Sequence, residues 1–197
     1  MLTRRVITYG SDTSADYRAT NVQVAGASWC FDVERGPDKP MLQVSLGIPG
    51  QHNVMNALAA IAIASDEGIA DEAIVQGLAE FAGVDRRFEI TAPVNIDDTT
   101  ITLVDDYGHH PTEVEAVIAT ARQVWPERRV VMVYQPHRFS RTKDLFDDFV
   151  RVLSTVDVLL LLDVYSAGEQ AIDGADSRSL IASIRQRGQI SPLHAQD

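Results

Sequence analysis

Cysteine is almost absent from this 197-residue sequence, which contains only Cys30. A single thiol cannot form a disulfide within the chain, and it cannot supply the repeated cysteines of a structural zinc site. The sequence therefore excludes both a disulfide-stabilised scaffold and a cysteine-rich zinc fold. A chain without internal disulfides is compatible with the reducing conditions of the cytoplasm.

Long apolar runs are also missing. No stretch approaches the roughly 20 apolar residues that cross a bilayer as a helix. The longest run, 156–164, is interrupted by Asp157 and Asp163 and is typical of a buried strand. The first nine residues lack the apolar core and the cleavage site of a signal peptide. From these features we expect a cytoplasmic protein without a membrane partner.

Positive charge is scarce. Acidic residues outnumber basic residues by 28 to 17, which gives a formal net charge of −11. A negative field repels nucleic acid and anionic membrane surfaces, so we expect no nucleic-acid partner. Apolar residues make up 45% of the sequence and charged residues 23%, the composition of an ordinary globular protein with one large or two small cores.

The first fifty residues show the alternation of apolar and polar positions that is typical of strands. A short strand is expected over 6–9, and a β-meander with one covered face follows. The alternating apolar positions of the meander are Val22 and Val24, then Trp29, Phe31 and Val33, then Leu42, Val44 and Leu46.

Helical patterns begin after residue 52. Residues 53–65 are rich in Ala, Leu, Met and Ile and are apolar on nearly all sides, which predicts a helix packed on several sides. A second helix is expected over 71–82, with acidic residues at its start and Gly83 at its end. Composition changes at residues 83–88, and we place a domain boundary between residues 84 and 85.

Residues 85–197 repeat the order strand, polar loop, helix. Strands are expected over 101–104, 130–134 and 158–162. One helix is expected to start at Pro111, where proline is well suited to the first position, and another to follow residue 141. A final helix over 177–187 is expected to stop at Gly188. Three such units in series predict an α/β domain with a parallel sheet. Residues 189–197 resemble the approach to a further strand, so we expect this Rossmann-like domain to be incomplete.

The loops after these strands carry the candidate functional residues, because ligands bind at the carboxyl ends of strands in open α/β sheets. In the loop 105–110, Asp106 is a candidate for a ribose hydroxyl, for a position behind a metal ligand, or for simple turn capping. His109 and His110 are adjacent, so we expect one to act and the other to pack. Asp, His, Gly and Pro are also common in turns without any function.

Paired arginines and paired asparagines are the other candidates. Arg138 and Arg141 are three residues apart at an expected helix start, where both can reach one anion or can remain solvated. Asn53 and Asn56 are also three apart, on one helical face. Their amides suit the edge of adenine, although helix capping explains Asn53 equally well.

Four segments together resemble the Mur ligase family. Residues 50–60 (GQHNVMNALAA) are similar to its Gly-x-His-Asn-x-x-Asn-Ala motif. Residues 85–89 (DRRFE), 105–113 (DDYGHHPTE) and 135–142 (QPHRFSRT) follow in the family's order. The last two segments are characteristic of the member that adds alanine. The resemblance covers essentially the whole chain.

The resemblance implies two domains and a set of site residues. Residues 1–84 would be the C-terminal part of the central ATP-binding domain, and residues 85–197 the C-terminal Rossmann-like domain. The nucleotide would be bound by His52, Asn53 and Asn56 at adenine, Arg87 at the phosphates and Asp106 at the ribose. Alanine would be bound by Tyr107, His109, Arg138 and Arg141. Among these residues, Arg87, His109, Arg138 and Arg141 would act in catalysis.

The reaction implied by the resemblance is ATP-dependent ligation of L-alanine to UDP-N-acetylmuramic acid, in peptidoglycan precursor synthesis. A carboxylate is a poor electrophile, so ATP with Mg²⁺ would first convert it to an acyl phosphate, which the amine of alanine then attacks. Phosphoryl transfer depends mostly on positioning and charge neutralisation. UDP-N-acetylmuramate, L-alanine and ATP are therefore the expected small-molecule partners.

The sequence departs from the family at the phosphate loop. Its only lysines, Lys39 and Lys143, do not follow a Gly-x-x-x-x-Gly pattern. The family's UDP-sugar domain and its Mg²⁺ ligands have no counterpart either, so no residue here is expected to bind metal. We therefore expect little or no ligase activity from this chain by itself.

Two alternatives belong to other functional classes. The first is a metal-dependent hydrolase that uses Asp105, Asp106, His109 and His110 as ligands, since carboxylate and imidazole suit Zn²⁺, Mn²⁺ or Fe. Adjacent histidines rarely coordinate one ion, which argues against it. The second is a non-catalytic module that binds a nucleotide or a partner.

Overall fold

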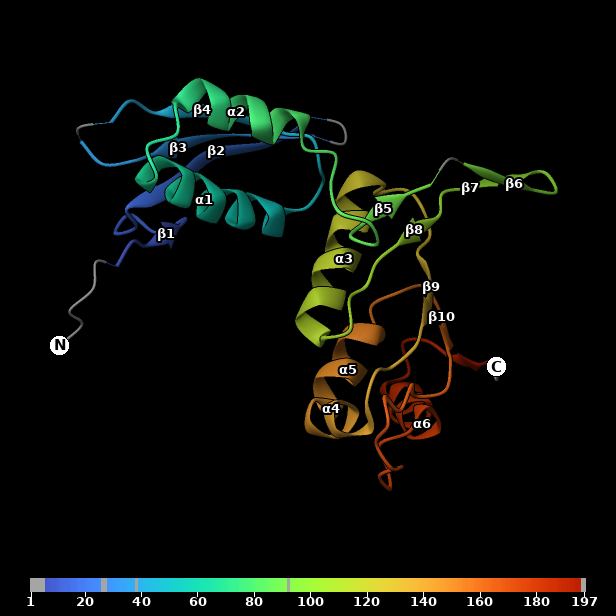
Figure 1. Cartoon of the computed structure of the whole chain (residues 1–197). Helices are drawn as coiled ribbons and strands as arrows, with labels where there is room; N and C mark the ends of the chain where they lie inside the picture. Colours follow the sequence, from blue (N-terminus) through green and yellow to red (C-terminus); the bar gives the residue numbers. More distant parts are fainter. Residues whose placement is uncertain (1–5, 26–27, 38, 92, 196–197) are drawn as a thin grey trace. The chain divides into compact units, whose positions relative to one another are not determined.

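The computed structural model describes residues 6–25, 28–37, 39–91 and 93–195 (Figure 1). The chain divides into two compact units, Met1–Asp106 and Tyr107–Asp197. Each unit has its own cluster of buried apolar side chains. Among the described residues, no helix is both long enough and apolar enough to cross a membrane.

The first unit contains a four-stranded sheet in the order β1-β2-β3-β4. Strands β2 (Tyr17–Ala25), β3 (Ser28–Glu34) and β4 (Leu42–Leu46) are antiparallel neighbours, which confirms the predicted meander. Strand β1 (Tyr9–Gly10) is parallel to β2 and begins later than the predicted strand 6–9. The backbone N–H of Thr8 donates to the Asp16 carboxylate at 2.8 Å instead of to a neighbouring strand.

Two helices pack with this sheet. Helix α1 (Gln51–Asp66) contacts β1, β2 and β3, and α2 (Asp71–Glu80) contacts β4. The prediction that α1 is buried on several sides is wrong, because its Ile63 is 67% exposed. The buried residues of α1 lie on one face and are Val54, Ala57, Leu58, Ile61 and Ala62.

Helix α2 ends earlier than predicted. It stops at Glu80, and Phe81 is already extended (φ −69°, ψ 111°), whereas the expected end was Gly83. The carbonyl oxygen of Phe81 lies 3.3 Å from the position that a Cβ on Gly47 would occupy. The backbone at Phe81 therefore passes close to Gly47, and α2 ends just before this contact.

Residues 85–106 of the first unit form two small antiparallel pairs. Strand β5 (Glu89–Ile90) pairs with β8 (Val104–Asp105), and β6 (Val94–Ile96) pairs with β7 (Thr99–Ile101). The strand predicted over 101–104 does not join the parallel sheet. Asp97 adopts a left-handed conformation (φ 50°) in the two-residue turn between β6 and β7, which is typical of hairpins.

The second unit is a parallel α/β unit, as predicted. Its three strands are β9 (Val131–Tyr134), β10 (Val158–Leu161) and β11 (Leu193–His194), in the order β11-β10-β9. Residues 189–197 were predicted to be only the approach to a further strand, whereas Leu193–His194 already form β11. The helices are α3 (Pro111–Val124), α4 (Phe139–Asp144), α5 (Phe146–Leu153) and α6 (Ser177–Arg187).

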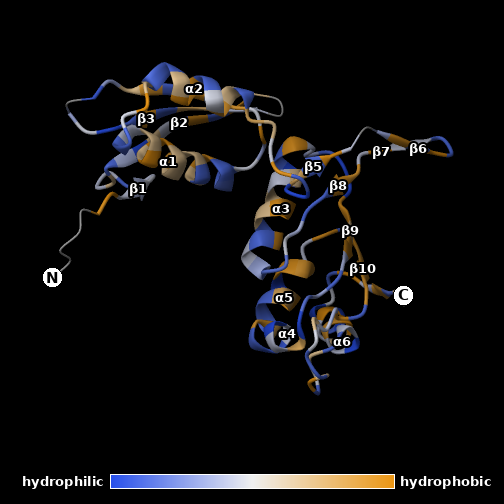
Figure 2. Cartoon of the chain, in the orientation of Figure 1, coloured by the Kyte–Doolittle hydropathy of each residue, from blue (hydrophilic) through white to orange (hydrophobic). Residues whose placement is uncertain are grey.

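The helix ends of the second unit follow the sequence closely. Pro111 is the first residue of α3, and α6 ends at Gly188, which is left-handed (φ 74°) as a C-terminal glycine should be. The single helix expected after residue 141 is divided at Leu145 (φ −115°) into α4 and α5. Hydrophobic and hydrophilic bands alternate along α3 in Figure 2, as expected for a helix with one buried face.

Candidate functional site

The start of α1 carries the first group of predicted residues. Gly50 has a positive φ of 107°, which a residue with a side chain rarely adopts, and it precedes the helix directly. Asn53 lies inside the helix, and its side-chain amide donates to the Pro49 carbonyl at 2.7 Å. The alternative that Asn53 caps the helix is therefore wrong. The Asn56 amide donates to the Asn53 side-chain oxygen at 3.2 Å, so the two asparagines lie together as predicted.

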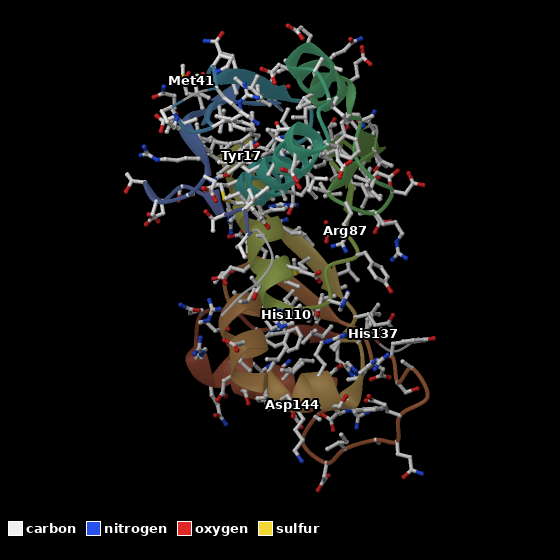
Figure 3. All side chains as sticks on the ribbon, turned by 60° about the vertical axis from the view of Figure 1, so that its left-hand side comes forward. Tyr17, Met41, Arg87, His110, His137 and Asp144 are labelled. Atoms are coloured by element: carbon white, nitrogen blue, oxygen red, sulfur yellow. The ribbon has the colours of Figure 1, made fainter. Side chains whose placement is uncertain are left out.

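His52 connects this helix start with two more predicted residues. Partial exclusion of water from its ring lowers the pKa of His52, and nearby Arg87 lowers this pKa further, while Asp106 raises it. These effects require His52, Arg87 and Asp106 to lie near one another within the first unit. Figure 3 labels Arg87 on the segment that follows α2. An imidazole that remains neutral at pH 7 suits contact with an uncharged base.

Asp106 also has a structural partner. One of its carboxylate oxygens accepts a hydrogen bond from the Phe88 backbone N–H at 2.8 Å. Phe88 is buried and left-handed (φ 48°), so this bond stabilises the turn next to Arg87. The turn-capping role considered for Asp106 is present, and ribose binding stays a prediction.

The two adjacent histidines of the second unit have different partners. His110 precedes α3, and its Nδ1 accepts from the Thr112 N–H at 3.3 Å, while Glu113 accepts from the His110 N–H at 3.1 Å. His110 is thus a helix cap. The Nδ1 of His109 lies 3.0 Å from the Tyr107 carbonyl oxygen, which can only accept, so this nitrogen carries the hydrogen. The Nε2 of neutral His109 is then a proton acceptor.

His137 is a site residue to which the sequence argument gave no role. A guanidinium nitrogen of Arg141 lies 3.2 Å from His137 Nδ1, and because arginine only donates, Nδ1 must accept. Neutral His137 therefore carries its hydrogen on Nε2, the opposite tautomer to His109. Burial lowers the pKa of His137, and the charges of Arg141 and Arg138 lower it further.

A row of four rings joins three loops of the second unit. The ring centres of Tyr107 and His109 are 5.3 Å apart, those of His109 and His137 are 5.9 Å apart, and those of His137 and Tyr165 are 5.3 Å apart. The last pair is stacked, with 25° between the planes. Tyr107 and His109 were predicted site residues, whereas His137 and Tyr165 were not. The loops that contain residues 107–109, 137 and 165 therefore lie next to one another.

Arg138 has an unusual backbone. Its φ is 71°, in the left-handed region, and it lies directly before α4. Its N–H donates to the Tyr165 carbonyl at 2.8 Å, and its carbonyl accepts from the N–H and the hydroxyl of Thr142 at 3.1 and 2.9 Å. Arg138 and Arg141 therefore belong to one hydrogen-bonded segment, as their spacing suggested.

The donor set at these places suits some ligands and not others. Two guanidinium groups beside imidazoles suit a small carboxylate, and the amides and imidazole at the start of α1 suit a base such as adenine. Within the described ranges, no group of three or more His, Cys, Asp or Glu side chains is placed to hold a metal ion.

Three of the four metal ligands proposed for the hydrolase alternative interact with other parts of the protein. Asp105 lies 3.6 Å from Arg86, Asp106 accepts from Phe88, and His110 caps α3. Because each side chain has a structural partner of its own, the arrangement does not support this alternative.

Comparison with known proteins agrees with the geometry. The Mur ligase glutamate ligase domain matches residues 86–197, and the Mur ligase middle domain matches residues 2–64. Among solved structures, UDP-N-acetylmuramate-alanine ligase MurC from Thermotoga maritima is 28% identical with a TM-score of 0.76. The match covers 97% of this chain and 39% of that protein, so the chain spans about two fifths of its length.

More distant structures share the fold. MurF from Acinetobacter baumannii is 21% identical, with a TM-score of 0.64 and coverage of 96% of this chain and 37% of that one. Folylpolyglutamate synthase from Mycobacterium tuberculosis is 18% identical, with a TM-score of 0.67 and coverage of 93% and 39%. Because the C-terminal family domain alone matches more than half of the sequence, this chain belongs to the Mur ligase family.

Proposed function

We propose that this chain supplies the adenine-binding residues and the amino-acid site of an ATP-dependent ligase that joins L-alanine to UDP-N-acetylmuramic acid. The observation that carries this proposal is the convergence of Arg138, Arg141 and two imidazoles in the second unit. The 28% identity to an alanine-adding ligase supports the choice of alanine.

The carboxylate of alanine is assigned to the two arginines. A guanidinium group binds a carboxylate through paired, charge-assisted hydrogen bonds. Arg141 is held in place by two bonds to His137, one to Nδ1 and one to the carbonyl, both 3.2 Å long. A side chain that is already ordered loses little entropy when it binds, which favours recognition of a small ligand.

The amine of alanine is assigned to His109. Its Nε2 is an acceptor in the neutral ring, since Nδ1 donates to the Tyr107 carbonyl. Free alanine is an ammonium ion at pH 7, and it must lose a proton before its nitrogen can attack. We assign His109 as the acceptor of this proton, and the Tyr107 ring contacts the His109 ring edge.

The nucleotide is assigned to the first unit. His52, Asn53 and Asn56 would contact adenine, Asp106 the ribose and Arg87 the phosphates. ATP, when bound, supplies the phosphoryl group that activates the carboxylate of the sugar substrate. We expect Asn56→Ala to weaken ATP binding about tenfold or less and to change the free energy of unfolding by less than about 0.5 kcal/mol, since its side chain is exposed. Calorimetry and thermal unfolding measure the two effects.

Alanine binding is the decisive test. We expect L-alanine to shift the NMR signals of His109 and His137, and propionate, which lacks the amine, to shift only those near the arginines. Arg138→Ala and Arg141→Ala should each weaken binding about 10- to 100-fold, the value of a hydrogen bond to a charged group. Arg151→Ala is the matched control, because Arg151 binds Glu115 on α3 instead. Equal affinity of all three variants for L-alanine contradicts the assignment.

Catalysis by the isolated chain is expected to be absent or very low, because the sequence has no phosphate-loop lysine. Phosphate release measured with ATP, Mg²⁺, UDP-N-acetylmuramate and alanine should stay at the level of a sample without protein. Alanine-dependent phosphate release by the pure chain would show that this part of the proposal is wrong.

A further inference from the structure

The backbone of Arg138 is the most informative strained position in the second unit. A φ of 71° is unfavourable for arginine, and such conformations persist at functional sites only where the surrounding structure enforces them. Arg138 is also one of the two arginines assigned to the carboxylate. The contacts that enforce this conformation therefore determine where the arginine pair lies.

The loop that follows β10 makes these contacts at two points. The Tyr165 carbonyl accepts from the Arg138 N–H at 2.8 Å, and the Tyr165 N–H donates to the Pro136 carbonyl at 2.9 Å. Two residues after Arg138, the Glu169 carboxylate accepts from the Ser140 N–H at 2.9 Å and from the Ser140 hydroxyl at 2.7 Å. Arg138 thus lies between Pro136 and Ser140, which are both hydrogen-bonded to the loop that follows β10.

Glu169 uses both of its carboxylate oxygens for Ser140. These hydrogen bonds lower the pKa of Glu169, and the charge of Arg138 lowers it further, so the carboxylate is ionised at neutral pH. Within the described part of the chain, no ion pair joins Glu169 to the Arg138 guanidinium. The Glu169 carboxylate is therefore hydrogen-bonded to Ser140, and the Arg138 guanidinium stays available for the carboxylate of the proposed substrate.

The position of Arg141 depends on the same segment. Ser140 and Arg141 are neighbours in α4, and Arg141 donates to the His137 ring and carbonyl one turn earlier. Thr142, which is fully buried, donates twice to the Arg138 carbonyl. Movement of Ser140 would therefore displace Arg138, Arg141 and His137 together.

We propose that Glu169 is a positioning residue: by binding Ser140 it fixes the left-handed backbone of Arg138 and directs the Arg138–Arg141 pair toward the carboxylate of the amino-acid substrate. The backbone part of this inference stands on the structure alone, and the last clause rests on the proposed function.

The backbone part is tested by NMR on the full chain. Scalar couplings that separate positive from negative φ should report a left-handed Arg138 in the wild type. Glu169→Ala should lose that signature, whereas Glu169→Gln should keep it, because an amide can accept from the Ser140 N–H and donate to its hydroxyl. Glu115→Ala is the matched control, since Glu115 is also a carboxylate with two hydrogen bonds, to Arg151. An unchanged Arg138 signature in Glu169→Ala overturns the proposal.

Ser140→Ala provides a second test that can be used if Glu169→Ala does not fold. It removes one hydroxyl and retains the backbone N–H bond, so it should shift the Arg138 signals partly toward those of Glu169→Ala while the chain stays folded. If the Arg138 couplings and shifts in Ser140→Ala match the wild type, the hydrogen bond from the Ser140 hydroxyl to Glu169 does not help to fix the Arg138 backbone, and this part of the proposal is overturned.

The functional part is tested by titration with L-alanine. Glu169→Ala, which removes both hydrogen bonds to Ser140, should weaken binding about tenfold. Glu169→Gln, which can form both bonds, should restore binding to within about threefold of the wild type. A wild-type chain that does not bind L-alanine would contradict the proposed function, while the couplings of Arg138 would still decide whether Glu169 holds its backbone. Normal alanine affinity in a folded Glu169→Ala variant would overturn the positioning role.

Discussion

The two units build their candidate sites in different ways. In the first unit, the residues assigned to adenine, His52, Asn53 and Asn56, are close in sequence, and one helix start brings them together, while Arg87 and Asp106 come from later segments. In the second unit, His109, His137 and Tyr165 come from three loops that meet only in the folded chain. A site on one helix depends mainly on local structure, whereas a site between loops depends on the core beneath them.

The largest effect is expected from removal of a core side chain in each unit. Phe149 is fully buried in the second unit and Leu58 in the first. Phe149→Ala should cost about 3–5 kcal/mol and Leu58→Ala about 2–5 kcal/mol, from lost burial and the remaining cavity. Phe149→Ala should increase hydrogen exchange at the loops around His137 and leave α1 protected, and Leu58→Ala should do the reverse. Equal loss of protection in both units would remove the contrast between the two sites.

A smaller effect is expected from Asp71, which stabilises the first unit away from α1. The Arg35 guanidinium, whose side chain is 2% exposed, makes two 2.7 Å bonds to Asp71. Asp71→Asn should cost about 1–3 kcal/mol, because a buried charge loses its partner. ATP binding at α1 should persist in this variant, and its loss would show that the first site is less local than described.

The Asp71 bond also predicts a pH dependence. The hydrogen bonds from Arg35 lower the pKa of Asp71 below its usual value of 3.8. The unfolded chain then binds more protons than the folded chain at acid pH. The stabilisation should be complete above the unfolded pKa of about 3.9 and should be lost as pH falls through the lower folded value. Acid unfolding of Asp71→Asn should show a weaker dependence in this range.

The smallest effect is expected from the tautomers of the second unit. Long-range ¹⁵N–¹H spectra should show hydrogen on Nδ1 of His109 and on Nε2 of His137. The pKa of His137 is lowered, so its contribution to stability should be complete above about pH 6.5 and decline below it, as the unfolded imidazole takes up a proton. His137→Gln should reduce this decline. Identical tautomers in both rings would contradict the hydrogen bond of His109 to the Tyr107 carbonyl or that of Arg141 to His137.

The sequence predicted those features that depend on neighbouring residues. Pro111 and Gly188 correctly placed the start of α3 and the end of α6, because proline and glycine fix backbone geometry locally. Alternating apolar residues in β3 and β4 correctly predicted the meander, since one face of that sheet is buried. The family motifs include Arg138 and Arg141, and their roles at a substrate stay a prediction.

Features that depend on distant contacts were not predicted. Glu169 and Tyr165 have no local signal, because their roles arise from hydrogen bonds to Ser140 and Arg138 across the loop edge. The division at Leu145 and the early end of α2 also depend on packing, which overrides helical pattern. His137 lies within a motif that resembles the family's, but its tautomer could not be predicted from the sequence. The tautomer follows from the hydrogen bond that Arg141 donates to its Nδ1.

The structural role of Asp106 has a consequence for genetics. One oxygen of this carboxylate accepts the Phe88 amide and so maintains the turn beside Arg87. A loss of function in Asp106→Ala would therefore have two combined causes, a disrupted turn and the loss of any contact to the ribose. Asparagine, which preserves an acceptor oxygen, separates these two causes, and a screen that samples only alanine would attribute both to the ligand.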